Sequence, residues 1–182
     1  MKGVLKQANA GFTMVEMIVV IAIVGILAAI AAPSWLALLT RQRVNAAQAE
    51  ALAVLRQAQA NSKREKREWQ TCFRDDGTKV MWSVTSATDK CNTVPTASWN
   101  NLVGENSDTI AIDTTNTNLP DAPSGYYRVI FQYKGLVSDG ASTRITFRSR
   151  VGSATDNSSK RCVRVETLLG AMSTAQNNEC NF

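Results

Sequence analysis

A run of 24 residues without a charged side chain, from Met17 to Thr40, constrains this sequence more than any other feature. As an α-helix it would be about 36 Å long, enough to cross the ~30 Å hydrocarbon core of a bilayer. The rest of the chain is polar and rich in Ser, Thr, Asn and Asp. Because 182 residues leave room for one further domain, the sequence predicts one membrane-spanning helix and a globular head.

The segment before the apolar run differs from an ordinary secretory signal. It carries Lys2 and Lys6 but no apolar core of its own, whereas a secretory signal has about seven to fifteen apolar residues before its cleavage site. An uncleaved signal anchor with a cytoplasmic amino terminus would account for this order, but it would leave the carboxylate of Glu16 unpaired at the membrane boundary. Cleavage after Gly11 would supply a partner, because the new amine of Phe12 would lie four residues before Glu16 or beside the glutamate of a neighbouring subunit.

The stretch GFTMVEMIVVIAIVGILAAIAAPSWL resembles the amino-terminal signature of type IV pilins and type II secretion pseudopilins. The matching features are the Gly11–Phe12 junction, Glu16 as the fifth residue after it, and Pro33 as the twenty-second. The resemblance implies cleavage after Gly11 by a prepilin peptidase, N-methylation of Phe12, and a helical filament in which Glu16 neutralises the amine of an adjacent subunit. A proline at this place in a helix is expected to kink it.

The same resemblance implies where the chain acts and with what. Before assembly the chain would be a single-pass protein of the inner membrane, surrounded by lipid, with its head outside the cytoplasm. Its partners would be other pilin or pseudopilin subunits and an inner-membrane assembly platform, and its final place would be a pilus or a periplasmic filament.

The remainder of the chain predicts an α+β head in which a helix packs on an antiparallel sheet. Apolar residues recur at helical spacing beyond Arg41, so we expect one helix from about Thr13 to Trp69 whose second half is buried. Alternation predicts strands at 127–133, 145–149 and 160–168, joined as a meander through a turn at Asp139-Gly140. This carboxyl-terminal block resembles the head of H-type pseudopilins and FimT-type minor pilins.

These patterns divide the chain into five segments. We expect a leader peptide, a membrane-spanning and filament-core helix, an amphipathic helix, a loop-rich variable region with short strands near Val80–Thr85 and Thr109–Asp113, and a final sheet with a disulfide-tied tail. The expected bounds are 1–11, 12–40, 41–70, 71–125 and 126–182.

All four cysteines follow the apolar run, as expected for disulfides in an exported domain. They allow three pairings, of which we favour the neighbours, Cys72 with Cys91 and Cys162 with Cys180. Free thiols and a four-thiolate zinc site are the alternatives, and we expect neither.

Basic residues gather in the second half of the head. Residues 128–170 carry eight basic side chains against three acidic ones. Arg144, Arg148 and Arg150 share one strand parity and should line an outward sheet face, which Arg161 and Arg164 would extend. Such a face could meet an acidic surface of a neighbouring subunit or bind nucleic acid through its phosphates. We favour the subunit contact, because the GRxR motif that carries the DNA-binding arginines of FimT-type proteins is missing after Gly170.

Composition argues against catalysis. The chain contains no histidine, which removes Ser-His-Asp and Cys-His nucleophile systems and His-ligated metals. No glycine-rich phosphate cradle is present, so we expect neither an enzyme nor a cofactor. Four oxygen-bearing residues resemble a calcium loop but lack EF-hand spacing, and turn formation explains them better: Asp113, Asn116, Asn118 and Asp121.

Overall fold

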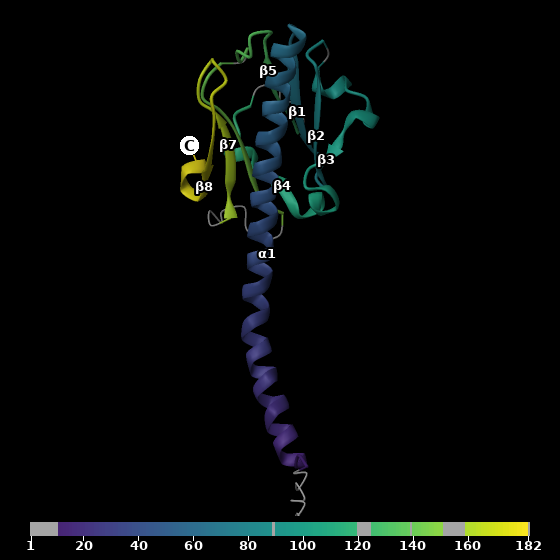
Figure 1. Ribbon diagram of the computed structural model, residues 1–182, viewed down its shortest axis with the longest axis vertical. Coiled ribbons are helices and arrows are strands. Elements are labelled where there is room, and N and C mark those ends of the chain that lie inside the picture. The colour runs from purple at the N-terminus through teal and green to yellow at the C-terminus, as the bar shows by residue number, and fades with distance from the viewer. Residues whose placement is uncertain (1–10, 89, 120–124, 139, 151–158, 182) are drawn as a thin grey trace, which may run out of the picture. The chain divides into compact units, whose positions relative to one another are not determined.

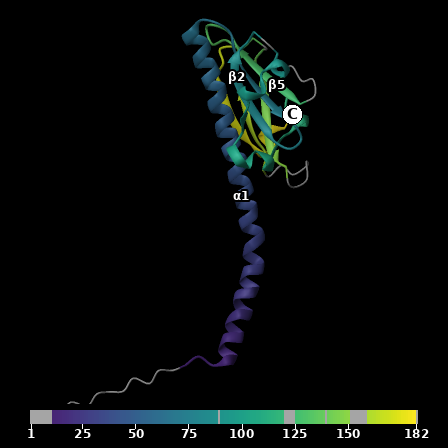
Figure 2. The same ribbon diagram turned by 90° about the vertical axis from the view of Figure 1, so that its right-hand side faces the viewer.

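The computed structural model describes residues 11–88, 90–119, 125–138, 140–150 and 159–181, with the backbone alone at 31–34 (Figures 1 and 2). One long helix, α1 (Met14–Glu65), is followed by two antiparallel four-stranded sheets, so the α+β class predicted from the sequence is confirmed. The chain divides into two compact units, one that ends at Leu38 and one that comprises Leu39–Phe182.

The first unit contains the amino-terminal part of α1. Thr13 caps the helix, because its Oγ1 accepts a hydrogen bond of 3.2 Å from the backbone N–H of Glu16. Every residue from Gly11 to Ile30 is exposed, although most of these side chains are apolar. Among the described residues α1 is the one helix long and apolar enough to cross a membrane, with a mean hydropathy of 2.8 in its most apolar window.

The second unit is the head, in which the remainder of α1 packs on both sheets (Figure 1). The first sheet has the strand order β3-β2-β1-β5, and the second has the order β4-β6-β7-β8. The strands of the first sheet are β1 (Trp69–Asp75), β2 (Val80–Ser86), β3 (Asn100–Asn101) and β5 (Tyr126–Phe131). Those of the second are β4 (Ile110–Ile112), β6 (Thr143–Ser149), β7 (Arg161–Val165) and β8 (Met172–Gln176).

The core lies between α1 and the two sheets. The predicted apolar stripe of the helix is buried as expected, at Val44, Ala47, Ala51, Leu55 and Ala58. Opposite it, most of the predicted inward side chains of the strands are buried too: Tyr127, Val129, Phe131, Ile145, Phe147, Val163 and Val165. Tyr133, which was predicted on the same face, is 51% exposed, because β5 ends at Phe131. Three alanines on the helix face allow its backbone to approach the sheets closely, since a methyl group is the only side chain between them.

The end of α1 differs from the prediction. The helix stops at Glu65 rather than near Trp69, because Lys66 takes a left-handed conformation with φ of 54°. The residues from Trp69 onward form β1, a buried strand that pairs with both β2 and β5. The prediction placed the helix end near Trp69 because no glycine or proline occurs between Arg41 and Trp69.

The sheet topology also corrects the expected meander. The strand at Tyr126–Phe131 does not pair with the strand at Thr143–Ser149, because the two belong to different sheets. The meander is instead β6-β7-β8, and its last strand was expected to be part of a polar tail. The segment 71–125 likewise holds more strand than predicted, since most of β1 and all of β2, β3 and β4 lie within it.

Candidate functional site

The amino-terminal candidate residues lie at the start of α1. Gly11 and Phe12 precede the first helical turn, and the Phe12 side chain is 77% exposed. Glu16 lies in the first turn, where a carboxylate interacts favourably with the positive end of the helix dipole. This geometry leaves the Phe12 backbone and the Glu16 carboxylate accessible to other molecules.

The predicted leader lies outside the described residues up to Ala10, and the side chain of Pro33 is not described either. The backbone at Pro33 is helical, and α1 is continuous from Met14 to Glu65. The expected kink therefore stays a prediction.

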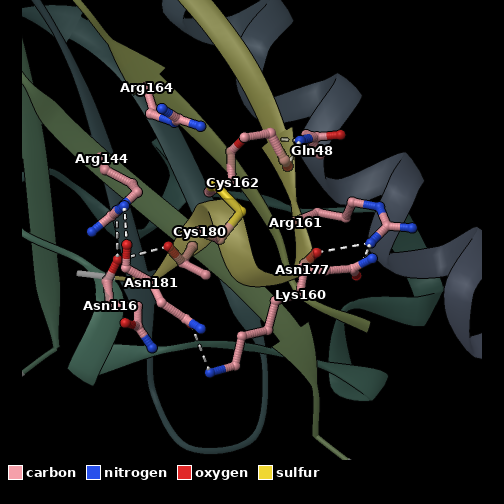
Figure 3. Close-up of a disulfide and its surroundings, with 12 residues drawn as sticks. Gln48, Asn116, Arg144, Lys160, Arg161, Cys162, Arg164, Asn177, Cys180 and Asn181 are labelled. Carbon is pink, nitrogen blue, oxygen red and sulfur yellow. Dashed lines mark hydrogen bonds between the residues drawn. A yellow bond between two sulfur atoms is a disulfide. The ribbon is translucent and has the colours of Figure 1, made fainter. Parts of the chain in front are cut away.

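The cysteines pair as neighbours, as we favoured from the sequence. Cys72 is bonded to Cys91, and Cys162 to Cys180, with Cα atoms 5.6 and 5.7 Å apart. The first disulfide fastens the loop after β2 to β1. The second fastens the carboxyl-terminal 3-10 turn η6 (Asn177–Cys180) to β7. The tail thus lies against the second sheet, as Figure 3 shows.

The five candidate arginines do not form one exposed face. Arg144, Arg148 and Arg164 lie on the outer face of the second sheet, the face opposite the core side chains Ile145 and Val163. Their predicted parity is correct, but Arg144 is only 8% exposed. Its Nε donates to the carbonyl oxygen of Asn116 at 3.2 Å and its Nη1 to that of Asn181 at 3.0 Å.

The other two arginines bind within the fold. Arg150 follows β6 and forms an ion pair of 2.8 Å with Asp75 of the first sheet. Arg161 belongs to the helix-facing side of β7, where its Nε donates to Asn45 of α1 at 2.6 Å. The prediction that the five arginines form one continuous basic surface is therefore wrong. Arg161 faces the helix, and Arg150 is paired with Asp75, so neither extends the outer face of the second sheet.

The acidic loop forms a turn, as expected. Asp113 accepts hydrogen bonds from the backbone of Thr115 and the side chain of Asn116, and it forms a buried ion pair of 3.0 Å with Lys160. Asp121, the last of the four residues that were considered for calcium and assigned to turn formation, lies outside the described residues. Within the described part of the chain, no group of three or more His, Cys, Asp or Glu side chains is placed to hold a metal ion.

Burial alone would raise the pKa of Asp113. The hydrogen bonds from Asn116 and Lys160, together with the charge of Lys160, outweigh that effect and hold the pKa below its ordinary value. Sequence reasoning missed this pair, because no local pattern joins Asp113, which follows β4, to Lys160, which precedes β7.

Sequence reasoning also missed a carboxylate that joins α1 to the first sheet. Glu50 was expected on the solvent-facing side of the helix. Its Oε1 accepts from Trp82 Nε1 at 2.6 Å, and its Oε2 accepts from the backbone N–H of Val103 at 2.7 Å. Both donors are neutral and distant in the sequence, so charge patterning gave no sign of the contact.

Comparisons with known proteins add one motif and one structural similarity. The prokaryotic N-terminal methylation motif matches residues 6–32. Two crystal forms of the type IV minor pilin FimU of Pseudomonas aeruginosa are similar in structure, with TM-scores of 0.46 and 0.44 and identities of 14% and 13%. The alignments cover 75% and 73% of this chain and 91% and 93% of FimU. No curated protein sequence matches the chain.

Proposed function

We propose that this chain belongs to the type IV pilin family, as its N-terminal methylation motif supports, and that it is a structural subunit of a type IV pilus or of a type II secretion filament. Within those filaments it acts as a minor pilin or pseudopilin. The chain is cleaved between Gly11 and Phe12, methylated on the new amine, and assembled through the amino-terminal part of α1. Its role is structural rather than enzymatic.

The observation that carries the proposal is the methylation motif on a helix that is apolar on every side. Exposed large apolar side chains run from Phe12 through Ile30. A helix that is apolar all round needs an apolar environment, which lipid provides before assembly and the packed helices of a filament core provide afterwards. In this proposal a single segment serves first as membrane anchor and then as filament core.

Glu16 would be costly in either environment without a partner. Cleavage after Gly11 creates a cationic amine on Phe12, and a neighbouring subunit can bring that amine to the Glu16 carboxylate. The ion pair would favour assembled over dispersed subunits, because only assembly neutralises both charges. Glu16 would thus select for a correctly processed and correctly placed neighbour.

The structure favours this role over DNA binding. A duplex is bound electrostatically by several cations that face its phosphates together. Arg150 and Arg161 are instead engaged with Asp75 and Asn45, and Arg144 is buried. This leaves the outer face of the second sheet poorly suited to a nucleic-acid backbone.

The first test replaces Glu16 with Ala in cells that make the filament. We expect Glu16→Ala to insert and to be cleaved normally, but to fall at least about tenfold in sheared filaments. The reason is that an unpaired charge in an apolar core costs several kcal/mol, and ~1.4 kcal/mol is a factor of ten. Mass spectrometry of the filaments and of the membrane fraction measures both the amount of the chain and the methylation of Phe12.

Glu105→Ala is the matched control, because Glu105 is an exposed carboxylate of the head, and it should assemble like the wild type. Normal assembly of Glu16→Ala would rule out the pairing role. A wild-type chain that keeps its leader, or that lacks a methylated Phe12, would overturn the proposal as a whole. Processed wild-type protein that is retained in the membrane and absent from surface filaments would identify a pseudopilin.

A further inference from the structure

Strand β8 (Met172–Gln176) is an edge strand of the second sheet. It pairs with β7 on one side and with no described strand on the other. Figure 1 shows it at the left-hand margin of the head. An edge strand leaves a row of backbone N–H and C=O groups without ladder partners, which makes it a template for pairing with another chain. The groups that β8 presents at this margin therefore decide what binds there.

Two hydrogen bonds at the ends of the β7–β8 ladder fix which residues of β8 bond to β7. The backbone N–H of Glu166 donates to the carbonyl oxygen of Ala171, and the N–H of Asn177 donates to that of Lys160. Hydrogen-bonded and non-hydrogen-bonded pairs alternate along an antiparallel ladder. The two ends give the same alternation, so the direction of every backbone group in β8 follows from them.

The outward-facing groups belong to every second residue of β8. Counted from either end of the ladder, Ser173 and Ala175 are the residues that bond to β7. Met172 and Thr174 direct both backbone groups away from the sheet, and Gln176 directs its N–H there. Within the described ranges no hydrogen bond uses these outward groups. Since Thr174 and Gln176 are exposed, the groups are open to another molecule.

The edge of the second sheet at β4 is closed by side chains. Asp75 Oδ2 accepts from the backbone N–H of Ile112 at 3.0 Å, and Arg150 Nη2 donates to the carbonyl oxygen of Ile110 at 2.7 Å. Both backbone groups face away from β6. The fold therefore satisfies this edge internally and leaves no room for an added strand.

The edges of the first sheet are closed as well. At β5 the chain turns back, and the N–H of Ser138 donates to the carbonyl oxygen of Ile130 at 3.0 Å. At the other edge β3 has only two residues, and a very short strand is a common protection against pairing. By contrast, the five residues of β8 include no charged residue and no proline. Among the described strands, β8 thus carries the one long and open edge.

The chain beyond β8 leads away from this edge. The Cys162–Cys180 disulfide fastens η6 to β7. The carbonyl oxygen of Asn181 then accepts from Arg144 of β6 at 3.0 Å. As Figure 3 shows, this tail lies across the strands of the second sheet, so it does not take the place of an added strand at β8.

A polar groove of about 230 Å³ lies beside the open edge, between α1 and β8. Its lining residues are Gln48, Thr174, Ala175, Gln176 and Glu179. Gln48 is fixed in the groove by hydrogen bonds to backbone carbonyl oxygens of β7 and β8. Because successive side chains of a strand point to opposite faces, an added strand would direct every second side chain toward this groove. The polar lining favours a polar side chain there.

We propose that β8 pairs with an extended segment of a neighbouring filament subunit, which adds a strand to the second sheet. Main-chain hydrogen bonds to an exposed sheet edge are an established way of binding an extended peptide. Neither a phosphate backbone nor a lipid headgroup offers the alternating donors and acceptors that the edge of β8 requires. This inference rests on the proposed function, because the segment comes from a subunit of the same filament.

The first experiment removes one outward N–H from the edge. Proline is tolerated in edge strands where its nitrogen faces away from the ladder, so Thr174→Pro should fold like the wild type in urea unfolding of the detergent-solubilised protein. We expect its amount in sheared filaments to fall at least about tenfold, because the carbonyl group of the added strand loses its donor. Thr174→Val keeps the N–H and is the matched control, which should assemble at the wild-type level. Mass spectrometry quantifies both variants against the wild type.

The second experiment measures the pairing in the wild-type chain. Hydrogen exchange, read residue by residue by mass spectrometry, compares the processed subunit in detergent with the sheared filaments. We expect the Thr174 amide to exchange at least about tenfold more slowly in filaments, because strand pairing protects it. The Ser173 amide bonds to β7 in both states, so it should be protected in both and is the internal control.

The outcomes separate the inference from the proposed function. Wild-type chain in filaments with a Thr174 amide that exchanges as fast as in detergent would overturn the inference alone. Undiminished Thr174→Pro, or equal losses of Thr174→Pro and Thr174→Val, would overturn it too. If Thr174→Pro fails to fold, the exchange of the wild-type amide decides. Absence of the wild-type chain from every filament fraction would instead overturn the proposed function.

Discussion

At the scale of single residues, the head depends on polar side chains whose partners are distant in the sequence. Among the ion pairs of the described residues, that between Asp113 and Lys160 is the most deeply buried, with side chains 5% and 6% exposed. Removing one member of such a pair leaves a charge in the interior without a counter-ion, which typically costs about 3–5 kcal/mol. The pair thus makes the connection between the β4 region and β7 strongly dependent on the ionisation of Asp113.

We predict that Lys160→Met lowers the free energy of unfolding by about 3–5 kcal/mol at pH 7. The pKa of Asp113 is held below its ordinary value in the folded protein. The ion pair therefore contributes fully above the ordinary aspartate pKa, and its contribution is lost as the pH falls through the folded pKa. The difference between wild type and Lys160→Met should accordingly shrink in the acid range.

Urea unfolding of the full-length protein in detergent, between pH 7 and pH 3, measures this difference. Lys90→Met is the control, because Lys90 is exposed, and it should change the stability by no more than about 0.5 kcal/mol. A Lys160→Met effect that is the same at both ends of the pH range would show that the ion pair does not account for it.

At the scale of secondary-structure elements, the buried face of α1 carries small side chains, and polar side chains lie on either side of it. Gln48 donates to the carbonyl oxygens of Cys162 and Ala175 at 2.7 and 2.8 Å, and Gln59 donates to that of Gly135 at 3.0 Å. These amides and Glu50 bind the part of α1 that lies in the head to strands of both sheets and to the loop after β5. The alanines between them set how close the helix lies to the strands.

We predict that Ala51→Leu destabilises the head by about 1–3 kcal/mol, because added methylene groups overpack a close contact. Ala51 is fully buried, whereas Ala53, two residues further along the same helix, is exposed. Ala53→Leu introduces the same side chain at an exposed position and should stay within about 0.5 kcal/mol of the wild type. Thermal unfolding followed by near-UV circular dichroism compares the two variants, and equal losses would refute close packing at Ala51.

At the scale of the whole head, two sheets that share no strand pairing must be joined by side chains and by the core. Phe73 of the first sheet meets Phe147 of the second edge to face, with ring centroids 6.2 Å apart. Asp75 adds a polar connection, since its Oδ2 accepts from the backbone N–H of Ile112 at 3.0 Å and its Oδ1 pairs with Arg150. The same guanidinium donates to the carbonyl oxygen of Ile110 at 2.7 Å, so it contacts both sheets.

We predict that Arg150→Gln lowers the unfolding free energy by about 2 kcal/mol, because it removes charge-assisted hydrogen bonds that are partly shielded from water. Arg148→Gln, two residues earlier and within β6, removes an arginine that contacts the neighbouring Ser149 carbonyl oxygen and should cost about 0.5 kcal/mol or less. Chemical denaturation measures both losses. Hydrogen exchange should show faster opening of β4 in Arg150→Gln alone, and unchanged protection there would contradict a joining role for Arg150.

The limits of the sequence-based prediction follow from these contacts. The apolar stripe of α1 and the inward residues of β5, β6 and β7 were predictable, because periodicity is local. Strand β1 was missed because no residue typical of a helix end separates it from α1. The basic surface was predicted from strand parity alone. Parity gives the side of the strand on which Arg144 lies, but not the hydrogen bonds that it donates to the carbonyl oxygens of Asn116 and Asn181.

The sequence by itself determined the apolar helix, the Gly11–Phe12 junction with its glutamate, and the exclusion of histidine chemistry, because each depends on residue type and spacing along the chain. The tertiary structure alone decided which strands share a sheet, which arginines face one another, and which acid Lys160 neutralises. Those outcomes depend on contacts between residues far apart in the chain, whose free energies are set by burial and register. No local pattern encodes either quantity.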